Sequence, residues 1–241
     1  MRPRLAVVVP AFNEAARIAP TLERVLAFLE QREEPFEIVV ADDGSSDGTS
    51  GVATRYASRG VVVVRLEPNQ GKGAAVRAGI AATRAERVLI TDADLSTPIE
   101  ELARLEAALG DADLAIGSRA VPGARIPVRQ PFYREMAGRT FNLLVQLAGG
   151  VRGLRDTQCG FKLLGGDLAR SLARELTVDR FAWDVELLWL ARRRGLRVAE
   201  VGVEWRNDPA SKVRFFRDSA RMLADILRFR RRHGAASGRA E

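Results

Sequence analysis

The chain has 241 residues, of which 46% are hydrophobic and 29% are charged, and its formal net charge is +7. This balance is typical of a folded chain with a sizeable hydrophobic core and excludes an intrinsically disordered one. The single cysteine, Cys159, excludes an internal disulfide bond and is typical of a reducing compartment, and the single histidine, His233, excludes a site built from several histidines.

The positive charge is concentrated near the C-terminus. Between residues 212 and 232, eight lysines and arginines stand against only two acids, Asp218 and Asp225. The basic character is therefore local, and we do not expect a nucleic-acid partner from it. No window holds about 20 uninterrupted apolar residues, and a strand-like run already begins at Leu5. We therefore expect no membrane-spanning helix, no signal peptide and a cytoplasmic location.

Apolar, β-branched runs alternate with helical patterns in the first half of the chain. Strands are expected over residues 5–9, 37–41, 61–66, 87–91 and 114–117. Helical spacing is clearest for the apolar residues between Leu22 and Leu29, a short helix is expected around Val52–Tyr56, and an alanine-rich helix over 74–85. This alternation predicts an α/β fold with a mostly parallel sheet.

The second half is less regular. Residues 119–131 are rich in Pro, Gly and Arg and predict a mobile loop. Helices are expected over 132–147, 167–175, 184–194 and 213–232, and strands over 161–164 and 197–205. We expect one domain over residues 1–211, divided at about residue 118 into two halves, followed by a basic amphipathic helix and tail over 212–241.

Polar residues follow four of the predicted strands at the point where each ends. They lie at 10–14, 42–49, 69–73 and 92–94. Ligands of open parallel sheets bind beyond the carboxyl ends of the strands. We therefore expect these four segments to line one crevice.

Asp92 and Asp94 give the clearest indication of a functional site in the sequence. Two carboxylates at i and i+2 after a strand can both reach one Mg²⁺ or Mn²⁺ ion, which takes one or two carboxylates together with phosphate oxygens. Such a pair by itself is more often a solvated turn. Because three further strand ends also carry polar residues here, we favour a metal site. A helix is expected next, with Thr97 as N-cap, Pro98 as first helical residue and Glu100 completing a capping box, and its N-terminus would favour phosphate.

Asp42 and Asp43 allow two interpretations. Asp, Gly and Ser favour a simple turn, whereas two adjacent acids at a strand end favour recognition of a nucleoside, which we prefer. The segment Gly71-Lys72-Gly73 lacks the spacing of a P-loop. No Gly-x-Gly-x-x-Gly follows the first strand, which argues against a nicotinamide or flavin enzyme.

Taken together, Pro10-Ala11-Phe12-Asn13-Glu14, Asp42-Asp43-Gly44-Ser45, Gly71-Lys72-Gly73 and Asp92-Ala93-Asp94 resemble glycosyltransferase family 2. Segments 155–162 and 181–188, with Trp205 and 211–212, resemble its polyprenyl-phosphate glycosyltransferases, and among them the dolichyl-phosphate β-glucosyltransferases. The resemblance covers about residues 5–212, and it implies that the half up to about residue 118 binds the nucleotide sugar and that the half over about 119–211 binds the acceptor. It implies a GT-A fold, a UDP-sugar donor (UDP-glucose by closest likeness), a divalent metal, a polyprenyl-phosphate acceptor and inversion at the anomeric carbon.

The resemblance also implies roles for individual residues. The nucleotide sugar would be bound by residues of the four strand-end segments, namely Pro10, Ala11, Asn13, Glu14, Asp42, Asp43, Gly71, Lys72, Asp92 and Ala93. Asp92 and Asp94 would hold the metal. Arg119 and Arg134 would meet the acceptor phosphate and, with Asp94, form the catalytic set. The acceptor side would also include Gln158, Lys162, Asp184 and Lys212.

Two positions depart from the family pattern: Ser96 stands where related mannosyl enzymes carry Gln, and Gly138 where relatives carry Ser. A phosphate monoester is already anionic at neutral pH, so its transfer needs no strong general base. If the acceptor were a hydroxyl group instead, Asp184 or Glu186 would be the natural base, and Asp184 is equally well explained as an acid in the first turn of a helix.

Other interpretations stay open at this stage. The C-terminal helix either lies on an anionic membrane, to which a lipid acceptor would bring it, or packs on its own domain with a solvated basic face. The enzyme could instead use a small soluble acceptor. A nucleotidyltransferase is disfavoured because its N-terminal glycine/arginine signature is missing. A non-catalytic nucleotide-sugar sensor or a nucleic-acid binder is disfavoured by the metal pair and the local charge.

Overall fold

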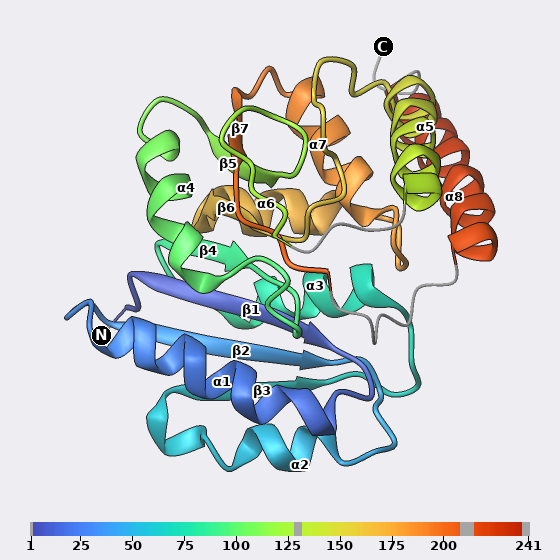
Figure 1. Cartoon of the computed structure of the whole chain (residues 1–241). Helices are drawn as coiled ribbons and strands as arrows, with labels where there is room; N and C mark the ends of the chain where they lie inside the picture. The colour runs from blue at the N-terminus through green and yellow to red at the C-terminus, as the bar shows by residue number, and fades with distance from the viewer. Residues whose placement is uncertain (1, 128–131, 208–214, 238–241) are drawn as a thin grey trace.

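A seven-stranded sheet forms the centre of the molecule (Figure 1). The computed structural model describes residues 2–127, 132–207 and 215–237, with backbone only for 132–140, 215–218 and 235–237. The strand order is β3-β2-β1-β4-β6-β5-β7, and β6 alone runs antiparallel to its neighbours. All seven predicted strands are present: β1 (Leu5–Ala11), β2 (Phe36–Asp42), β3 (Val61–Arg65), β4 (Arg87–Ile90), β5 (Leu114–Ser118), β6 (Lys162–Gly165) and β7 (Val198–Gly202).

Eight α-helices connect and cover the strands in the described part of the chain. They are α1 (Ala15–Glu30), α2 (Thr49–Thr54), α3 (Lys72–Ala82), α4 (Leu102–Leu109), α5 (Phe132–Gly149), α6 (Gly166–Glu175), α7 (Trp183–Arg193) and α8 (Phe215–Ser237). Two short 3-10 turns, η1 (Ala57–Arg59) and η2 (Ile99–Glu101), complete the set. The predicted mainly parallel α/β architecture is confirmed.

The alternation of side chains along the strands separates two hydrophobic cores. Val7 and Val9 point to the face covered by α1 and α4, where they pack with Leu22 and Leu102. Ala6 and Val8 point to the opposite face, covered by α3, α6 and α7. A strand buried on both faces is uniformly apolar, because every second residue faces each core. This explains why β1 has no polar residue.

The C-terminal helix α8 packs on its own domain. Met222, Ile226 and Phe229 are buried in the same core as the residues of α6 and α7. Figure 1 shows α8 lying alongside α5 at one side of the molecule. Leu227 and the arginines of the outer face remain exposed. The helix therefore has both a packed apolar face and a solvated basic face.

The helix start expected at Thr97 differs from the structure. Thr97 caps nothing and is buried, Pro98 occupies the N-cap position, and only the 3-10 turn η2 follows before α4 begins at Leu102. Glu100 forms an ion pair with Arg24 on α1 at 3.0 Å and does not complete a capping box. The segment turns early because the buried Ile99 anchors it in the core below α1.

The loop expected over residues 119–131 is tied to β7 in its described part. Arg125 forms a bridge with Glu204 in the segment after β7, and its backbone N–H donates to the carbonyl of Val203 at 3.1 Å. A side chain at Gly202 would collide with the backbone of this loop, 2.5 Å from the nitrogen of Ala124. Residues 128–131 lie outside the described residues.

Candidate active site at the carboxyl edge of the sheet

The predicted strand-end segments meet at one edge of the sheet. Strands β1, β2 and β4 are parallel neighbours, with Ala11 opposite Asp42 and Val8 opposite Ile90. Their carboxyl ends therefore emerge side by side. Pro10 and Ala11 belong to β1 itself and are buried there, so both support the edge through their backbone.

Hydrogen bonds join the loop after β1 to the loop after β2. The backbone N–H of Asn13 donates to Ser45 Oγ at 2.8 Å, and Asn13 Oδ1 accepts from the N–H of Ser46 at 2.9 Å. Glu14 donates its N–H to Thr49 Oγ1 at 2.8 Å. Asn13 has a φ of 55°, a left-handed conformation that Asn adopts more readily than most residues. The two loops thus form one hydrogen-bonded unit.

Asp42 is fully buried, and its carboxylate serves the turn that follows β2. Oδ1 accepts the N–H of Ser45 at 2.9 Å. Oδ2 contacts the hydroxyl of Ser50 and lies 3.4 Å from Arg65 Nη1. Both oxygens are therefore occupied within the protein, as the turn interpretation of this residue requires.

Asp43 connects the end of β2 to the loop that carries Lys72. Its Oδ1 accepts the N–H of Gln70 at 2.8 Å, and its Oδ2 accepts the N–H of Gly71 and the side-chain amide of Asn69, both at 2.7 Å. Burial raises the pKa of Asp43 above its usual value, although the two backbone N–H groups oppose the shift. Gly71 has a φ of 120°, and a side chain there would lie 2.4 Å from the carbonyl of Asp179.

Lys72 links this loop to the predicted metal pair. Its Nζ lies 2.5 Å from Asp92 Oδ1. Burial disfavours the charge of Lys72, but the carboxylates of Asp92, Asp184 and Asp94 outweigh it and raise the lysine pKa. Burial likewise opposes the charge of Asp92, but Lys72 outweighs it and lowers the Asp92 pKa. Because Asp43 holds residue 71 and Asp92 holds residue 72, both acid pairs share one edge.

Asp94 lies beside the ion pair between Lys72 and Asp92, and its own carboxylate adds a second negative charge there. Its Oδ1 accepts the N–H of Ser96 at 2.9 Å. Burial and then the negative charge of Asp92 raise the pKa of Asp94 above its usual value. The turn is closed by Leu95, a buried residue with a φ of 47°. A bulky residue in this left-handed region costs about 1–2 kcal/mol, which the packing of its side chain must offset.

Asp92 and Asp94 could together hold one divalent cation if ligand oxygens completed its coordination. Among the residues that the structure describes, no group of three or more Asp, Glu, His or Cys side chains converges as a metal cage. Mg²⁺ is commonly bound by one or two carboxylates and substrate phosphates, so two carboxylates suffice. Burial first, and then repulsion from Asp92, raise the pKa of Asp94, and a cation bound beside the two carboxylates would oppose both effects.

Gly160 is a site residue that the sequence analysis missed. A Cβ atom at this position would lie 2.3 Å from Asp92 Oδ2 and 2.6 Å from Oδ1. The backbone of residue 160 therefore forms the wall against which the Asp92 carboxylate rests. The neighbouring Cys159 is buried, and burial raises its thiol pKa. This agrees with an ordinary buried cysteine.

Arg119 is held by Asp156 in a bidentate ion pair. Its Nε and Nη2 donate to the two carboxylate oxygens at 2.7 and 2.9 Å, and its backbone N–H adds a third bond at 2.9 Å. Burial opposes the charge of Asp156, but Arg119 outweighs it and lowers the Asp156 pKa to about 2. The guanidinium also lies over the Trp205 ring, 5.2 Å from its centroid. It is near enough to Asp92 to lower that carboxyl's pKa.

Lys162 and Asp184 form a buried pair beneath the site. Lys162 is fully buried, donates to the carbonyl of Cys159 at 2.5 Å and lies 3.5 Å from Asp184 Oδ1. At that distance the contact is an ion pair without hydrogen-bond geometry, and Asp184 Oδ1 has no hydrogen-bond donor in the described structure. Burial raises the pKa of Asp184 against the opposing charges of Lys162 and Lys72. Asp184 thus belongs to the cluster around Lys72.

The structure separates Glu186 from Asp184. Glu186 is fully buried, and it accepts the N–H groups of Thr177 and Val178 at 2.9 and 2.8 Å. Its other oxygen lies 2.8 Å from the Thr177 hydroxyl and from His233 Nε2. His233, on α8, thereby packs against α7, where its ring lies 5.1 Å from that of Trp189. Glu186 is a loop anchor and has no oxygen left for a role as base.

Three acceptor-side predictions receive less support from the described contacts. Gln158 donates its backbone N–H to Asp156 Oδ1 at 3.2 Å, which places it beside Arg119. Arg134 lies in α5, and its side chain is outside the described residues. Lys212 is also outside the described residues.

Known proteins resemble this chain in sequence and in fold. The family model "Glycosyl transferase family 2" matches residues 6–162. The dolichyl-phosphate beta-glucosyltransferase of Homo sapiens is 36% identical over 99% of this chain and 78% of its own length. Its Drosophila melanogaster counterpart is 40% identical over 92% and 73%. The UDP complex of Mycobacterium tuberculosis glucosyl-3-phosphoglycerate synthase superposes with a TM-score of 0.64 at 22% identity, covering 94% of this chain and 80% of that one. The expected GT-A fold is confirmed.

Proposed function

The chain belongs to glycosyltransferase family 2, and from that premise we propose that it transfers glucose from UDP-glucose to a polyprenyl phosphate with inversion, assisted by a divalent cation. The observation that carries the proposal is the charged cluster at the strand edge, where Asp92 and Asp94 lie beside Lys72 and within electrostatic reach of Arg119. This cluster combines two carboxylates for a cation with two cations for phosphate oxygens.

The sugar donor would bind across the hydrogen-bonded loops that follow β1 and β2. The backbone of Asn13 and Glu14, together with the loop held by Asp43, would enclose the nucleoside. Lys72 would contact the diphosphate, since its ammonium already balances Asp92 and is held charged at neutral pH. Ala93 and Gly71 contribute backbone at the same edge. Asp42, with both oxygens occupied by its own turn, would act through the shape of that turn.

Asp92 and Asp94 would hold the Mg²⁺ or Mn²⁺ ion, which supplies charge neutralisation for the UDP leaving group. The raised pKa of Asp94 would fall once a cation is bound, because positive charge stabilises the carboxylate. Gly160 would keep the Asp92 carboxylate in place from behind. Ser96, which contributes its N–H to Asp94, would orient that carboxylate and would not be a ligand itself.

The acceptor phosphate would meet Arg119. Asp156 and Trp205 fix the guanidinium, so little side-chain entropy is lost when Nη1 binds a phosphate oxygen. Arg134, Gln158 and Lys212 complete the acceptor side of the proposal. An acceptor oxygen then forms a bond to the anomeric carbon as the bond from that carbon to the diphosphate breaks. The phosphate is already anionic, so Asp184 is assigned to electrostatic balance of Lys72 and Lys162 instead of proton removal.

A lipid acceptor suggests peripheral contact with the cytoplasmic face of an anionic membrane. In the part of the chain that the structure describes, no helix has the length and apolar character needed to cross a bilayer. The described part of α5 exposes Leu143, Leu144 and Leu147, and the adjoining α8 exposes Leu227 beside basic residues. Apolar side chains rimmed by arginines are typical of a surface that lies on anionic lipid.

Vesicle flotation tests this contact without removing α8, whose buried residues belong to the core. We expect Leu143→Gln combined with Leu147→Gln to reduce binding to vesicles of phosphatidylglycerol. The matched control Val62→Gln changes an exposed apolar residue on the edge strand β3 and should leave binding unchanged. Equal binding of all three proteins would contradict the membrane assignment.

One assay tests the reaction itself. Purified protein is given a panel of nucleotide sugars with polyprenyl phosphate in detergent, with 3-phosphoglycerate or without acceptor, each in the presence of Mg²⁺, Mn²⁺ or EDTA. We expect UDP release from UDP-glucose with polyprenyl phosphate and a divalent cation. Release with 3-phosphoglycerate alone would support the soluble-acceptor alternative. Release of pyrophosphate would indicate a nucleotidyltransferase, and no release under any condition would indicate a non-catalytic protein.

A further inference from the structure

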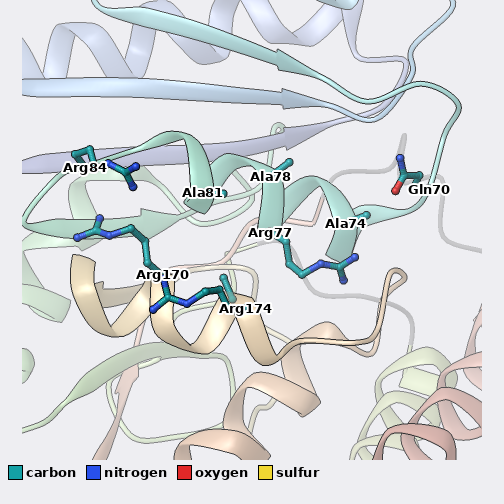
Figure 2. Close-up of a pocket in the computed structure, with 9 residues that line it drawn as sticks. Gln70, Ala74, Arg77, Ala78, Ala81, Arg84, Arg170 and Arg174 are labelled. Atoms are coloured by element: carbon teal, nitrogen blue, oxygen red, sulfur yellow. The ribbon is translucent and has the colours of Figure 1, made fainter. Parts of the chain in front are cut away.

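A second positively charged feature lies outside the cluster just described. A groove of about 440 Å³ runs between α3 and α6 (Figure 2). Four arginines line it: Arg77 and Arg84 on or just after α3, and Arg170 and Arg174 on α6. Four alanines and Gln70 make up the rest of the lining, and it contains no acidic residue. The volume falls in the range of small-molecule sites, about 300–1,000 Å³.

Two of the four arginines are partly balanced by acids next to the groove. Arg170 forms an ion pair with Asp167 at 2.6 Å. Arg77 pairs with Asp179 and donates to the carbonyl of Val178 at 3.0 Å. The side chains of Arg77 and Arg170 are only 26% and 10% exposed, and Arg170 also donates to the carbonyls of Thr83 and Ala85, so these two arginines add a background positive charge more than direct contacts for a ligand.

The other two arginines are unbalanced. Arg84 and Arg174 are exposed, and neither side chain has a hydrogen bond or an ion pair within the described residues. Like charges brought together in one concave surface repel, and an anion that binds between them removes that repulsion. The planar guanidinium group matches phosphate oxygens in a bidentate geometry. The charge of the groove therefore favours a phosphate-bearing ligand.

The shape of the groove follows from the alanines of α3. Ala74, Ala78 and Ala81 are spaced by four and three residues, so they share one face of the helix. Ala173 of α6 stands opposite. Because none of these side chains extends beyond Cβ, the two helices leave an open channel with an apolar floor, and Figure 2 shows the arginines standing along it.

We propose that this α3–α6 groove is a second anion site, which binds a soluble small molecule carrying a phosphate or diphosphate group. The concave, single-ligand volume favours a soluble molecule over a flat lipid surface. The site is separate from the charged cluster at the strand edge but touches the same elements. Gln70 lies at one end, and Arg77 holds the 178–179 backbone that packs against Gly71 and Gly73.

Calorimetric titration with inorganic pyrophosphate, in EDTA and at constant ionic strength, tests the site on the full chain. We expect Arg84→Gln combined with Arg174→Gln to weaken binding at least about tenfold, since two charge-assisted contacts are lost. The matched control, Arg231→Gln combined with Arg232→Gln, removes the same charge from exposed positions on α8 and should stay within about twofold of wild type. Pyrophosphate bound at the strand edge would be common to all these proteins and cancels in the comparison.

A second variant tests shape without changing charge. Ala78→Leu fills the channel with a good helix former, so the protein should fold and pyrophosphate binding should weaken as well. Equal weakening in the α8 control, or no wild-type binding up to about 10 mM, would overturn the proposal. Vesicles of phosphatidylglycerol give the lipid comparison. If the groove variant lost vesicle binding but kept pyrophosphate binding, the soluble ligand would be the wrong assignment.

Discussion

The tripeptide Asp-Ala-Asp occurs twice in this chain, at residues 92–94 and at residues 111–113, with different consequences. The first follows β4, and the second precedes β5. Because β4 and β5 are each antiparallel to β6, they are parallel to one another, so the two tripeptides lie at opposite edges of the sheet. Asp111 is exposed, and Asp113 accepts the N–H of Arg197 at 2.7 Å.

The surroundings, and not the tripeptide, give the first pair its chemistry. Asp92 and Asp94 share their edge with Lys72 and lie within electrostatic reach of Arg119, whereas the Asp113 carboxylate accepts a backbone N–H and Asp111 is exposed. A pair of acids is a candidate cation site only where a strand delivers it to a ligand-binding edge. The second pair is a natural control for experiments on the first.

The sharpest way to test this comparison is Asp94→Asn against Asp111→Asn. We expect Asp94→Asn to lower glucose transfer by about 10²–10³-fold, since half of the proposed cation ligands lose their charge. Asp111→Asn should leave the rate within about twofold. Both are measured as UDP release. An Asp94→Asn protein that keeps more than half of its activity would refute the metal role.

Gly160→Ala tests whether the wall behind Asp92 matters. The added Cβ would lie 2.3 Å from the carboxylate, so Asp92 must move, and we expect kcat to fall by about 10–100-fold. Gly165→Ala is the matched control, because a Cβ at that position meets nothing within 4 Å and φ is −60°. Similar rates for the two variants would show that the position of Asp92 is not critical.

Asp43→Asn distinguishes a loop anchor from a group that only binds nucleotide. The amide replaces one acceptor oxygen by a donor that faces the N–H of Gln70 or Gly71. We expect the free energy of unfolding to fall by about 1–3 kcal/mol, because buried donors lose their partner. Denaturant unfolding without ligand measures it, again with Asp111→Asn as control. Unchanged stability would mean that the loop is held without this carboxylate.

The smallest expected effect is a pH dependence of stability. The folded-state pKa of Asp94 is raised, so its contribution is fully present below the unfolded pKa of about 3.9 and is lost as pH rises through the folded value. In EDTA, Asp94→Asn should therefore be more stable than wild type near neutral pH, and the difference should shrink in acid. Added Mn²⁺ should reverse the order. A pH-independent difference would contradict the assignment of the raised pKa.

The edge that carries the site could be predicted from sequence alone. Apolar runs of β-branched residues specify strands wherever they occur, and parallel strands must place their carboxyl ends together, so the positions of Asp43, Lys72, Asp92 and Asp94 followed from local pattern. The resemblance of the strand-end motifs to known sequences predicted the family. The 97–100 segment was predicted incorrectly because a capping pattern yields to the packing of Ile99.

Only the tertiary structure decided which of these charges are balanced. Sequence spacing could not show that the Asp42 carboxylate accepts hydrogen bonds from its own turn, or that the backbone of Gly160 supports Asp92. It also could not separate Glu186, which accepts the backbone N–H of Val178, from Asp184, which faces Lys162. The contact between Asp92 and Gly160 joins residues far apart in the sequence, and burial sets the strength of such pairings. The chain's local chemistry therefore determined where polar groups leave the sheet, and packing determined what each group meets there.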